Sequence, residues 1–175
     1  KIQEVLKERA DVLGQDMNID STIASVVPET TVARSPETYF GAWRNTNLGN
    51  GVPGQTGLQN LTLAHRVQPN TLYLSGAWDI QREFARTAHS DGRIFFYYGA
   101  QKVFLVARAE KPVTMKILVD GKPMGREAGK DVIDGEVTVS EDRLYRLVED
   151  REYGEHILEI IVEDAGLEAY AFTFG

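Results

Sequence analysis

The chain has 175 residues, of which 42% are hydrophobic and 26% charged, a composition typical of a globular domain with its own core. The net charge is -7 and there is no dense stripe of lysine and arginine, which argues against binding to nucleic acid or to an anionic membrane surface. Because the chain has no cysteine, it cannot itself provide a disulfide, a thiolate zinc site or thiol redox chemistry.

Residues 1–14 have the pattern of an amphipathic helix that ends at Gly14. Four apolar residues recur at helical spacing, with charged residues largely on the other side: Ile2, Val5, Leu6 and Leu13. Since no capping residue precedes Ile2, we expect this segment to be the end of the last helix of a preceding domain, with an apolar side that packs on a partner. Residues 15–34 lack periodicity and are expected to form a linker or extended arm.

The rest of the chain has the pattern of strands. Residues 44–60 are rich in glycine and asparagine and predict a loop, which lacks the Gly-Lys-Ser/Thr ending of a phosphate-binding loop. Apolar runs separated by turn residues then predict strands near 72–80, 94–98, 103–106, 113–119, 137–139, 144–148, 157–162 and 169–174. The runs 94–98 and 103–106 are expected to be two adjacent buried strands, and Asp120-Gly121 to be a tight hairpin turn. The sequence therefore predicts an all-β fold, an antiparallel, jelly-roll-like β-sandwich over residues 35–175 preceded by a short N-terminal helix.

No catalytic motif of known spacing is present. His65, His89 and His156 are far apart in the sequence and are expected to be surface or strand histidines rather than ligands of one metal. Asp79 and Glu83 could act as a glycosidase pair, which needs two carboxylates about 5–10 Å apart. Their spacing of four residues does not match a strand period, so we favour solvated charges at a sheet edge.

The segment 129–136 forms an oxygen-rich loop that contains Asp131, Asp134 and Glu136 between Gly129 and Gly135. Calcium prefers several hard oxygen ligands, so a structural calcium ion is one interpretation of this loop. An ordinary Asp-Gly turn is the other, and we favour it. No metal and no cofactor is predicted.

Aromatic residues beside polar ones mark the candidate ligand-binding positions. Sugar-binding sandwiches stack pyranose rings on Trp or Tyr and bind the hydroxyl groups with polar side chains. We expect one or two of the rings of Tyr39, Trp43, Trp78 and Tyr98 to be exposed, above all Trp43, and the others to be core. The candidate ligand-binding residues are Tyr39, Trp43, Arg44, Asn45, Trp78, Asp79, Glu83 and Tyr98.

Several segments resemble the C-terminal domain attached to thioredoxin-like proteins of the DipZ type, which are thiol–disulfide interchange or cytochrome-c-biogenesis proteins. They are SPETYFG (35–41), YLSGAWDI (73–80), ILVDGKPMG (117–125), DRLYRLVED (142–150) and LEAYAFTFG (167–175). The resemblance implies a jelly-roll similar to carbohydrate-binding modules, on the extracytoplasmic side of a bacterial membrane. It also implies a thioredoxin-like domain directly upstream, whose final helix would be residues 1–14.

We therefore expect a non-catalytic accessory domain of an extracytoplasmic thiol–disulfide oxidoreductase that binds carbohydrate or cell-wall glycan. The alternative is a structural or protein-interaction module that packs on the thioredoxin-like domain or dimerises it, and a glycoside hydrolase is a remote alternative. The redox-active cysteine pair that the resemblance assigns to the upstream domain is absent from this chain. No binding to nucleic acid and no direct insertion into a membrane are expected of it.

Overall fold

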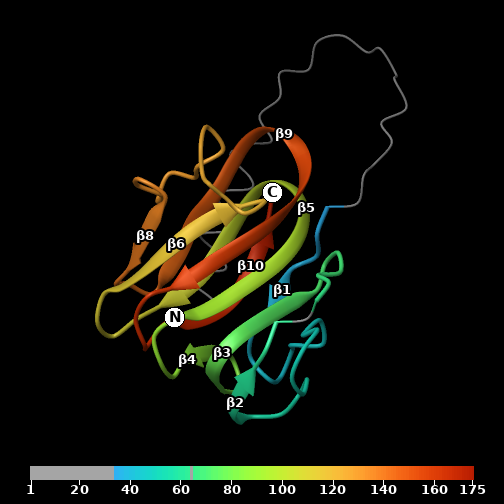
Figure 1. Cartoon of the computed structure of the whole chain (residues 1–175), viewed down its shortest axis with the longest axis vertical. Helices are drawn as coiled ribbons and strands as arrows, with labels where there is room; N and C mark the ends of the chain where they lie inside the picture. The colour runs from blue at the N-terminus through green and yellow to red at the C-terminus, as the bar shows by residue number, and fades with distance from the viewer. Residues whose placement is uncertain (1–33, 64) are drawn as a thin grey trace.

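The computed structural model describes residues 34–63 and 65–175, and this part of the chain consists of β-strands and their connections (Figure 1). The all-β prediction is confirmed, since these residues contain no helix. They accordingly include no helix of the length and apolarity needed to cross a membrane. The predicted helix at 1–14, and the linker at 15–34 except Arg34, lie outside the described residues.

Ten strands pair into one hydrogen-bonded network in which all the strand pairs are antiparallel. They are β1 (Thr38–Tyr39), β2 (Gly57–Leu61), β3 (Leu72–Ile80), β4 (Ala85–Thr87), β5 (Gly92–Arg108), β6 (Val113–Val119), β7 (Lys122–Pro123), β8 (Glu136–Val139), β9 (Arg143–Val162) and β10 (Glu168–Phe174). The order is β1-β10-β4-β3-β5-β9-β6-β7, with β2 on β3 and β8 on β6. An additional pairing of β10 with β5 closes a circuit through β10, β4, β3 and β5.

Two long strands, β5 with 17 residues and β9 with 20, run side by side through the whole network. Their pairing extends from Gly92 opposite Val162 to Ala107 opposite Arg143. On its other side, β5 pairs first with β3 and then with β10. The prediction of two separate strands at 94–98 and 103–106 is wrong, because both runs belong to β5. A register shift between Ala100 and Lys102 marks a bulge, which bends the strand without ending it.

The same correction applies to β9, which contains both of the predicted strands at 144–148 and 157–162. β2 begins at Gly57, inside the predicted loop at 44–60. The hairpin prediction is confirmed. Asp120 and Gly121 have φ angles of 51° and 73°, and Val119 pairs with Lys122 across the turn.

The main core lies between the inward faces of these strands. Residues at alternate positions of β5 enter it, and they pack with large buried side chains from other strands such as Trp78, Phe96, Tyr145 and Phe172. Each such side chain contributes about 1.5–3 kcal/mol through burial. Strand β10 is buried along its whole length, which explains why its sequence AYAFTF lacks clear alternation. Its second face carries the candidate site.

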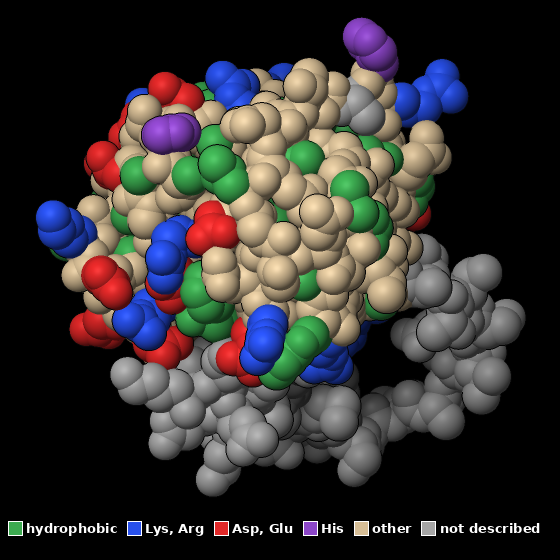
Figure 2. All heavy atoms as spheres, turned by 90° about the horizontal axis from the view of Figure 1, so that it is seen from below, with side chains coloured by type: hydrophobic (Ala, Val, Ile, Leu, Met, Phe, Trp, Pro, Cys, Tyr) green, Lys and Arg blue, Asp and Glu red, His purple; other side chains and the backbone are tan. Residues whose placement is uncertain are grey.

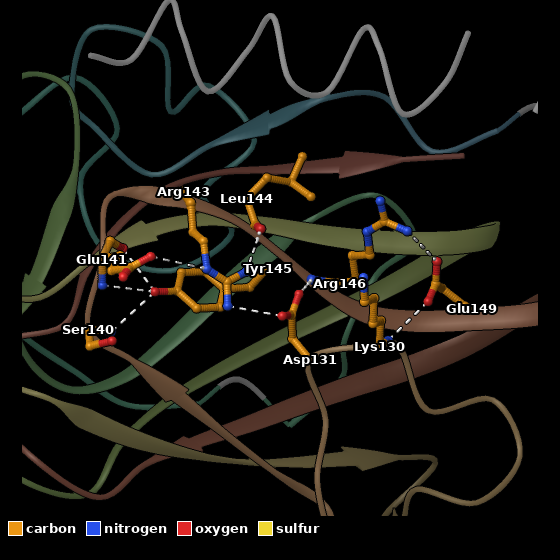
Figure 3. Close-up of polar contacts among 9 residues, drawn as sticks. All are labelled: Lys130, Asp131, Ser140, Glu141, Arg143, Leu144, Tyr145, Arg146 and Glu149. Carbon is orange, nitrogen blue, oxygen red and sulfur yellow. Dashed lines mark hydrogen bonds and ion pairs between the residues drawn. The ribbon is translucent and has the colours of Figure 1, made fainter. Parts of the chain in front are cut away.

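Tyr145 joins the turn before β9 to this core (Figure 3). Its ring is buried, and its hydroxyl accepts hydrogen bonds from the amides of Ser140 and Glu141, each at 3.1 Å. The same hydroxyl donates to the carbonyl of Glu141 at 2.9 Å. The guanidinium of Arg143 lies 3.9 Å from the ring centroid on its face. One phenol thus satisfies three backbone groups of the connection between β8 and β9.

Replacement of Tyr145 by Phe should lower the free energy of unfolding by about 1–3 kcal/mol, because partly buried backbone groups would lose their partner. Denaturant-induced unfolding measures this change. Tyr97→Phe is the matched control, since the Tyr97 hydroxyl makes an exposed hydrogen bond to Glu155 at 3.3 Å. The control should change stability by less than about 0.5 kcal/mol. Equal effects of the two variants would contradict the role given to Tyr145.

Candidate ligand-binding site

A small pocket of approximately 80 Å³ lies on the face of β10 and β5 that points away from the main core. Val106, Tyr170 and Ala171 on these strands form its floor. Its walls come from β1 with the segment after it and from the segment between β3 and β4. They contain Tyr39, Gly41, Trp43, Arg44, Arg82 and Glu83. Four of the predicted ligand-binding residues, Tyr39, Trp43, Arg44 and Glu83, are therefore brought together here.

Strand register places Tyr39 beside this floor. Tyr39 is opposite Ala171, and Ala171 is opposite Val106. Cross-strand partners in an antiparallel sheet share a face, so the three side chains form one row. The pocket therefore depends on the pairing of the short strand β1 with β10.

Gly41 allows the two walls to approach each other closely. A Cβ atom at this position would lie 2.2 Å from the carbonyl carbon of Glu83, a distance that no side chain tolerates. Backbone hydrogen bonds hold the walls together, from the Ala42 amide to the Gln81 carbonyl at 2.8 Å and from the Trp43 amide to the Arg82 carbonyl at 3.0 Å. The backbone of Trp43 is thus held against the segment between β3 and β4.

The Trp43 side chain is 66% exposed, and the Tyr39 side chain is half-buried. The Arg82 guanidinium lies 5.7 Å from the Trp43 ring centroid, and the Arg44 guanidinium lies 3.7 Å from the Tyr39 ring centroid. Both arginines are in cation–π contact with the rings, which restricts the rotation of these side chains. The hydroxyl of Tyr39 donates a hydrogen bond to Glu37. The expectation of one or two accessible aromatic rings agrees with this arrangement.

The side chain of Tyr170 is held by the buried carboxylate of Glu168. Its hydroxyl donates to Glu168 at 3.1 Å, and Glu168 is itself bound by Arg86 at 2.5 Å. Burial, and then the negative charge of Glu168, raises the pKa of Tyr170. The hydroxyl therefore stays protonated at neutral pH and keeps donating. This contact fixes the ring in the floor of the pocket.

Three predicted ligand-binding residues are buried instead. Asn45 is 1% exposed, and its side-chain oxygen accepts a hydrogen bond from the Gly54 amide at 2.8 Å, which closes the loop between them. Trp78 is 0% exposed, and its indole N–H donates to the Ser75 carbonyl at 2.9 Å. Tyr98 is 1% exposed in the main core. Because stacking requires an accessible ring face and a ligand contact requires an unburied polar group, we remove these residues from the candidate set.

Asp79 does not line the pocket. Its side chain instead accepts a hydrogen bond from the Gln81 side chain at 2.8 Å. Among the described residues, Glu83 is the single carboxylate in the pocket lining. A glycosidase needs a second carboxylate across the bound sugar. The pairing of Asp79 with Glu83 that would give a hydrolase is therefore not assembled in this pocket.

Two contributors to the pocket, Arg82 and Tyr170, were missed by the candidate set. Arg82 lies in the aromatic and charged segment around Trp78. The sequence shows that it is a charged residue near aromatic ones, but not that it contacts Trp43. Tyr170 lies in an almost continuous apolar run, where no alternation indicates which face it occupies. Both assignments require the pairing of segments that are distant in the sequence.

Protein donors occupy the oxygens of Asp131 in the oxygen-rich loop (Figure 3). One oxygen accepts a hydrogen bond from Arg143 at 2.9 Å and the other from the Arg146 amide at 2.7 Å. Asp134 and Gly135 have φ angles of 52° and 81° and form a tight turn. Within residues 34–63 and 65–175, no group of three histidine or acidic side chains is placed to hold a metal ion. These contacts favour the Asp-Gly turn over the calcium site.

The described surface in Figure 2 shows acidic and basic side chains interspersed, without a continuous basic stripe on that face. This distribution gives no local attraction for a polyanion to offset the negative net charge of the chain.

Comparison with known proteins places the chain beside thioredoxin-like proteins. Residues 35–175 match the model of the family described as the thioredoxin-like C-terminal domain. Two curated relatives, both called Protein DipZ, come from Mycobacterium bovis and Mycobacterium tuberculosis. They are 26% identical over 159 residues, which cover 87% of this chain and 20% of theirs. The chain thus spans a fifth of the length of these relatives.

Two solved structures of family two carbohydrate esterases show a weaker likeness. One, from Clostridium thermocellum in complex with cellohexaose, has a TM-score of 0.44 at 16% identity and covers 53% of this chain and 27% of that chain. The other, from Cellvibrio japonicus, has a TM-score of 0.43 at 10% identity and covers 79% of this chain and 33% of that chain. Both TM-scores are too low to carry an argument about fold or ligand.

The hydrogen bonds of Asp131 give a test of this loop. Burial alone would raise the pKa of Asp131, but the hydrogen bonds from Arg143 and the Arg146 amide outweigh it and hold the pKa below its ordinary value. A carboxylate with a lowered folded pKa stabilises the fold above its unfolded pKa of about 4, and this stabilisation is lost as the pH falls through the folded pKa.

Asp131→Asn should therefore lower the free energy of unfolding by about 1–3 kcal/mol at pH 7, and the loss should shrink as the pH falls below about 4. Denaturant titrations over that pH range measure both effects. Asp134→Asn is the matched control, because asparagine also accepts the left-handed conformation of this exposed turn. A loss for Asp131→Asn that does not change with pH would contradict the assignment.

Proposed function

Since the chain belongs to the thioredoxin-like C-terminal domain family, we propose that it is a non-catalytic accessory domain of an extracytoplasmic thiol–disulfide oxidoreductase, and that it binds carbohydrate or cell-wall glycan. The absence of cysteine supports the non-catalytic part, because thiol chemistry would have to come from another domain. A jelly-roll-like sandwich, similar to carbohydrate-binding modules, is part of the same proposal.

The exposed ring of Trp43 is the observation that carries the glycan proposal. An accessible aromatic face is what stacking on a sugar ring requires, and this ring stands at the edge of a pocket with an apolar floor. Its backbone and the nearby Arg82 already fix its position. A pyranose that stacks on it would therefore bind with little further loss of side-chain freedom.

Polar groups at the pocket edge suit the hydroxyl and carboxylate groups of such a ligand. The guanidinium groups of Arg44 and Arg82 can donate hydrogen bonds to a ligand, and the carboxylate of Glu83 can accept them. The residues that line the pocket include two cations and one anion, so the lining itself carries a net positive charge in an acidic protein. Cell-wall glycans that carry carboxylates should therefore bind better than neutral polysaccharides. The volume of about 80 Å³ is small beside the ~300–1,000 Å³ of enclosed ligand sites, so a ligand would lie across the surface.

Trp43→Ala should weaken the binding of soluble peptidoglycan fragments at least about tenfold, because it removes the stacking surface. It should leave the free energy of unfolding nearly unchanged, since the ring is exposed. Calorimetric titration measures the binding, with cello-oligosaccharides as the neutral comparison.

Tyr153→Ala is the control for this experiment. Tyr153 is 39% exposed and lines a different pocket with Tyr97 and Glu155. The Tyr153→Ala variant should therefore bind glycan as tightly as the unmodified chain. No binding of the unmodified chain to any fragment, or an equal loss in the two variants, would contradict the proposal.

A second candidate function is an interaction module that packs on the thioredoxin-like domain or dimerises it, without a small ligand. One observation favours it: Leu58 on β2 and Ile157 on β9 are large apolar side chains that are exposed on the described surface. Comparing the activity and stability of the full-length protein with and without this domain separates the two functions. If removal of the domain lowers the activity and added glycan has no effect on that loss, the interaction module is favoured.

A further inference from the structure

A second, larger hollow adjoins the candidate ligand-binding pocket. Its volume is approximately 450 Å³, and its lining consists of Thr56, Gln81, Arg82, Glu83 and Phe84; we call it the second hollow. Arg82 and Glu83 line both spaces, so the two meet at this part of the segment between β3 and β4. The volume of the second hollow lies within the ~300–1,000 Å³ of ligand sites, whereas that of the pocket does not.

The two spaces share an apolar floor. Phe84 lines the second hollow and Tyr170 lines the pocket, and the centroids of their rings are 5.2 Å apart. Both side chains pack in the outward-facing apolar cluster that also contains Val106. An extended ligand can therefore pass from one space into the other while its apolar faces stay in contact with protein carbon atoms.

Hydrogen bonds hold the loop that carries Thr56 in place. The Gly54 amide donates to the buried side chain of Asn45 at 2.8 Å, and the Gln59 side chain donates to the Gln55 carbonyl at 3.3 Å. Thr56 itself is exposed at the wall of the second hollow. Its hydroxyl can both donate and accept a hydrogen bond, which suits the hydroxyl groups of a sugar. A ligand thus meets a wall that is already formed.

The charges of the two linings differ. Arg44 lines the pocket and not the second hollow, so the pocket has two cations and one anion, whereas Arg82 is balanced by Glu83 in the second hollow. The other polar residues of the second hollow, Thr56 and Gln81, are uncharged. An acidic unit therefore suits the pocket, and a neutral unit with hydroxyl or amide groups suits the second hollow.

We propose that the pocket and the second hollow are adjoining subsites for one linear glycan, in which an acidic sugar stacks on Trp43 and a neutral sugar next to it binds beside Thr56 and Gln81. This inference rests on the proposed function, because its first subsite is the pocket beside Trp43. It specifies the ligand as a chain of at least two sugar units with a carboxylate on one of them. The small pocket of about 80 Å³ is then one end of a longer site.

Calorimetric titration of the chain 1–175 with sugars of two lengths tests the proposal. N-acetylmuramic acid carries a carboxylate and can fill the pocket alone, whereas the two disaccharides that link it in either order to N-acetylglucosamine can fill both subsites. One of the disaccharides should bind at least about tenfold more tightly than N-acetylmuramic acid, because the neutral unit adds its own contacts.

The outcomes separate this inference from the function on which it rests. Equal affinities for N-acetylmuramic acid and both disaccharides, all weakened by Trp43→Ala, would overturn the second subsite and leave the proposed function standing. No binding of any of these sugars would overturn the proposed function, and the second subsite with it.

Thr56→Leu distinguishes contact at the second hollow from a general preference for longer sugars. Leucine removes the hydroxyl and adds bulk at an exposed position, so the tighter-binding disaccharide should lose most of its advantage while N-acetylmuramic acid binds as before. Thr138→Leu, at an exposed position of β8, is the matched control and should change neither affinity. Equal losses for the single sugar and the disaccharide, or equal effects of the two leucine variants, would contradict the assignment.

Discussion

The continuous backbone pairing of β5 with β9 is the constraint on which the rest of the structure depends. One ladder runs from Gly92 opposite Val162 to Ala107 opposite Arg143, while the other edge of β5 changes its partner from β3 to β10. The pair β5–β9 thus extends both through the part of the sheet that contains β3 and through the part that contains β10. Because residues alternate between faces, the half of β5 that pairs with β10 supplies the core on one side and the pocket floor on the other.

A few backbone contacts place the walls of the candidate site around that floor. Pairing of β1 with β10 brings Tyr39 beside Ala171, and the close approach at Gly41 sets the distance between the two walls. Cation–π contacts then hold the rings of Tyr39 and Trp43. The result is an exposed tryptophan of fixed position beside charged side chains, which is an arrangement suited to a polar ligand with a flat apolar face.

Local patterns made part of this structure predictable. Strict alternation predicted β6, Asp120-Gly121 predicted its hairpin, and the position of Trp43 beside a polar loop predicted its exposure. The continuity of β5 and β9 was not predictable, because Gly99 and its neighbours resemble a turn when the partner strand is unknown. The outward face of β10 was hidden for a similar reason, since burial on both faces removes the alternation that would assign Tyr170. The contact between Arg82 and Trp43 arises only from the pairing of distant segments.

Binding of a glycan in the pocket beside Trp43 can be observed by an NMR titration of the isotope-enriched chain 1–175 with a soluble, carboxylate-bearing peptidoglycan fragment. We expect chemical-shift changes that saturate and are concentrated at residues 41–44, 82–83, 106 and 170–171. Changes centred on Tyr97 and Tyr153, or no change at any concentration of the fragment, would contradict this expectation.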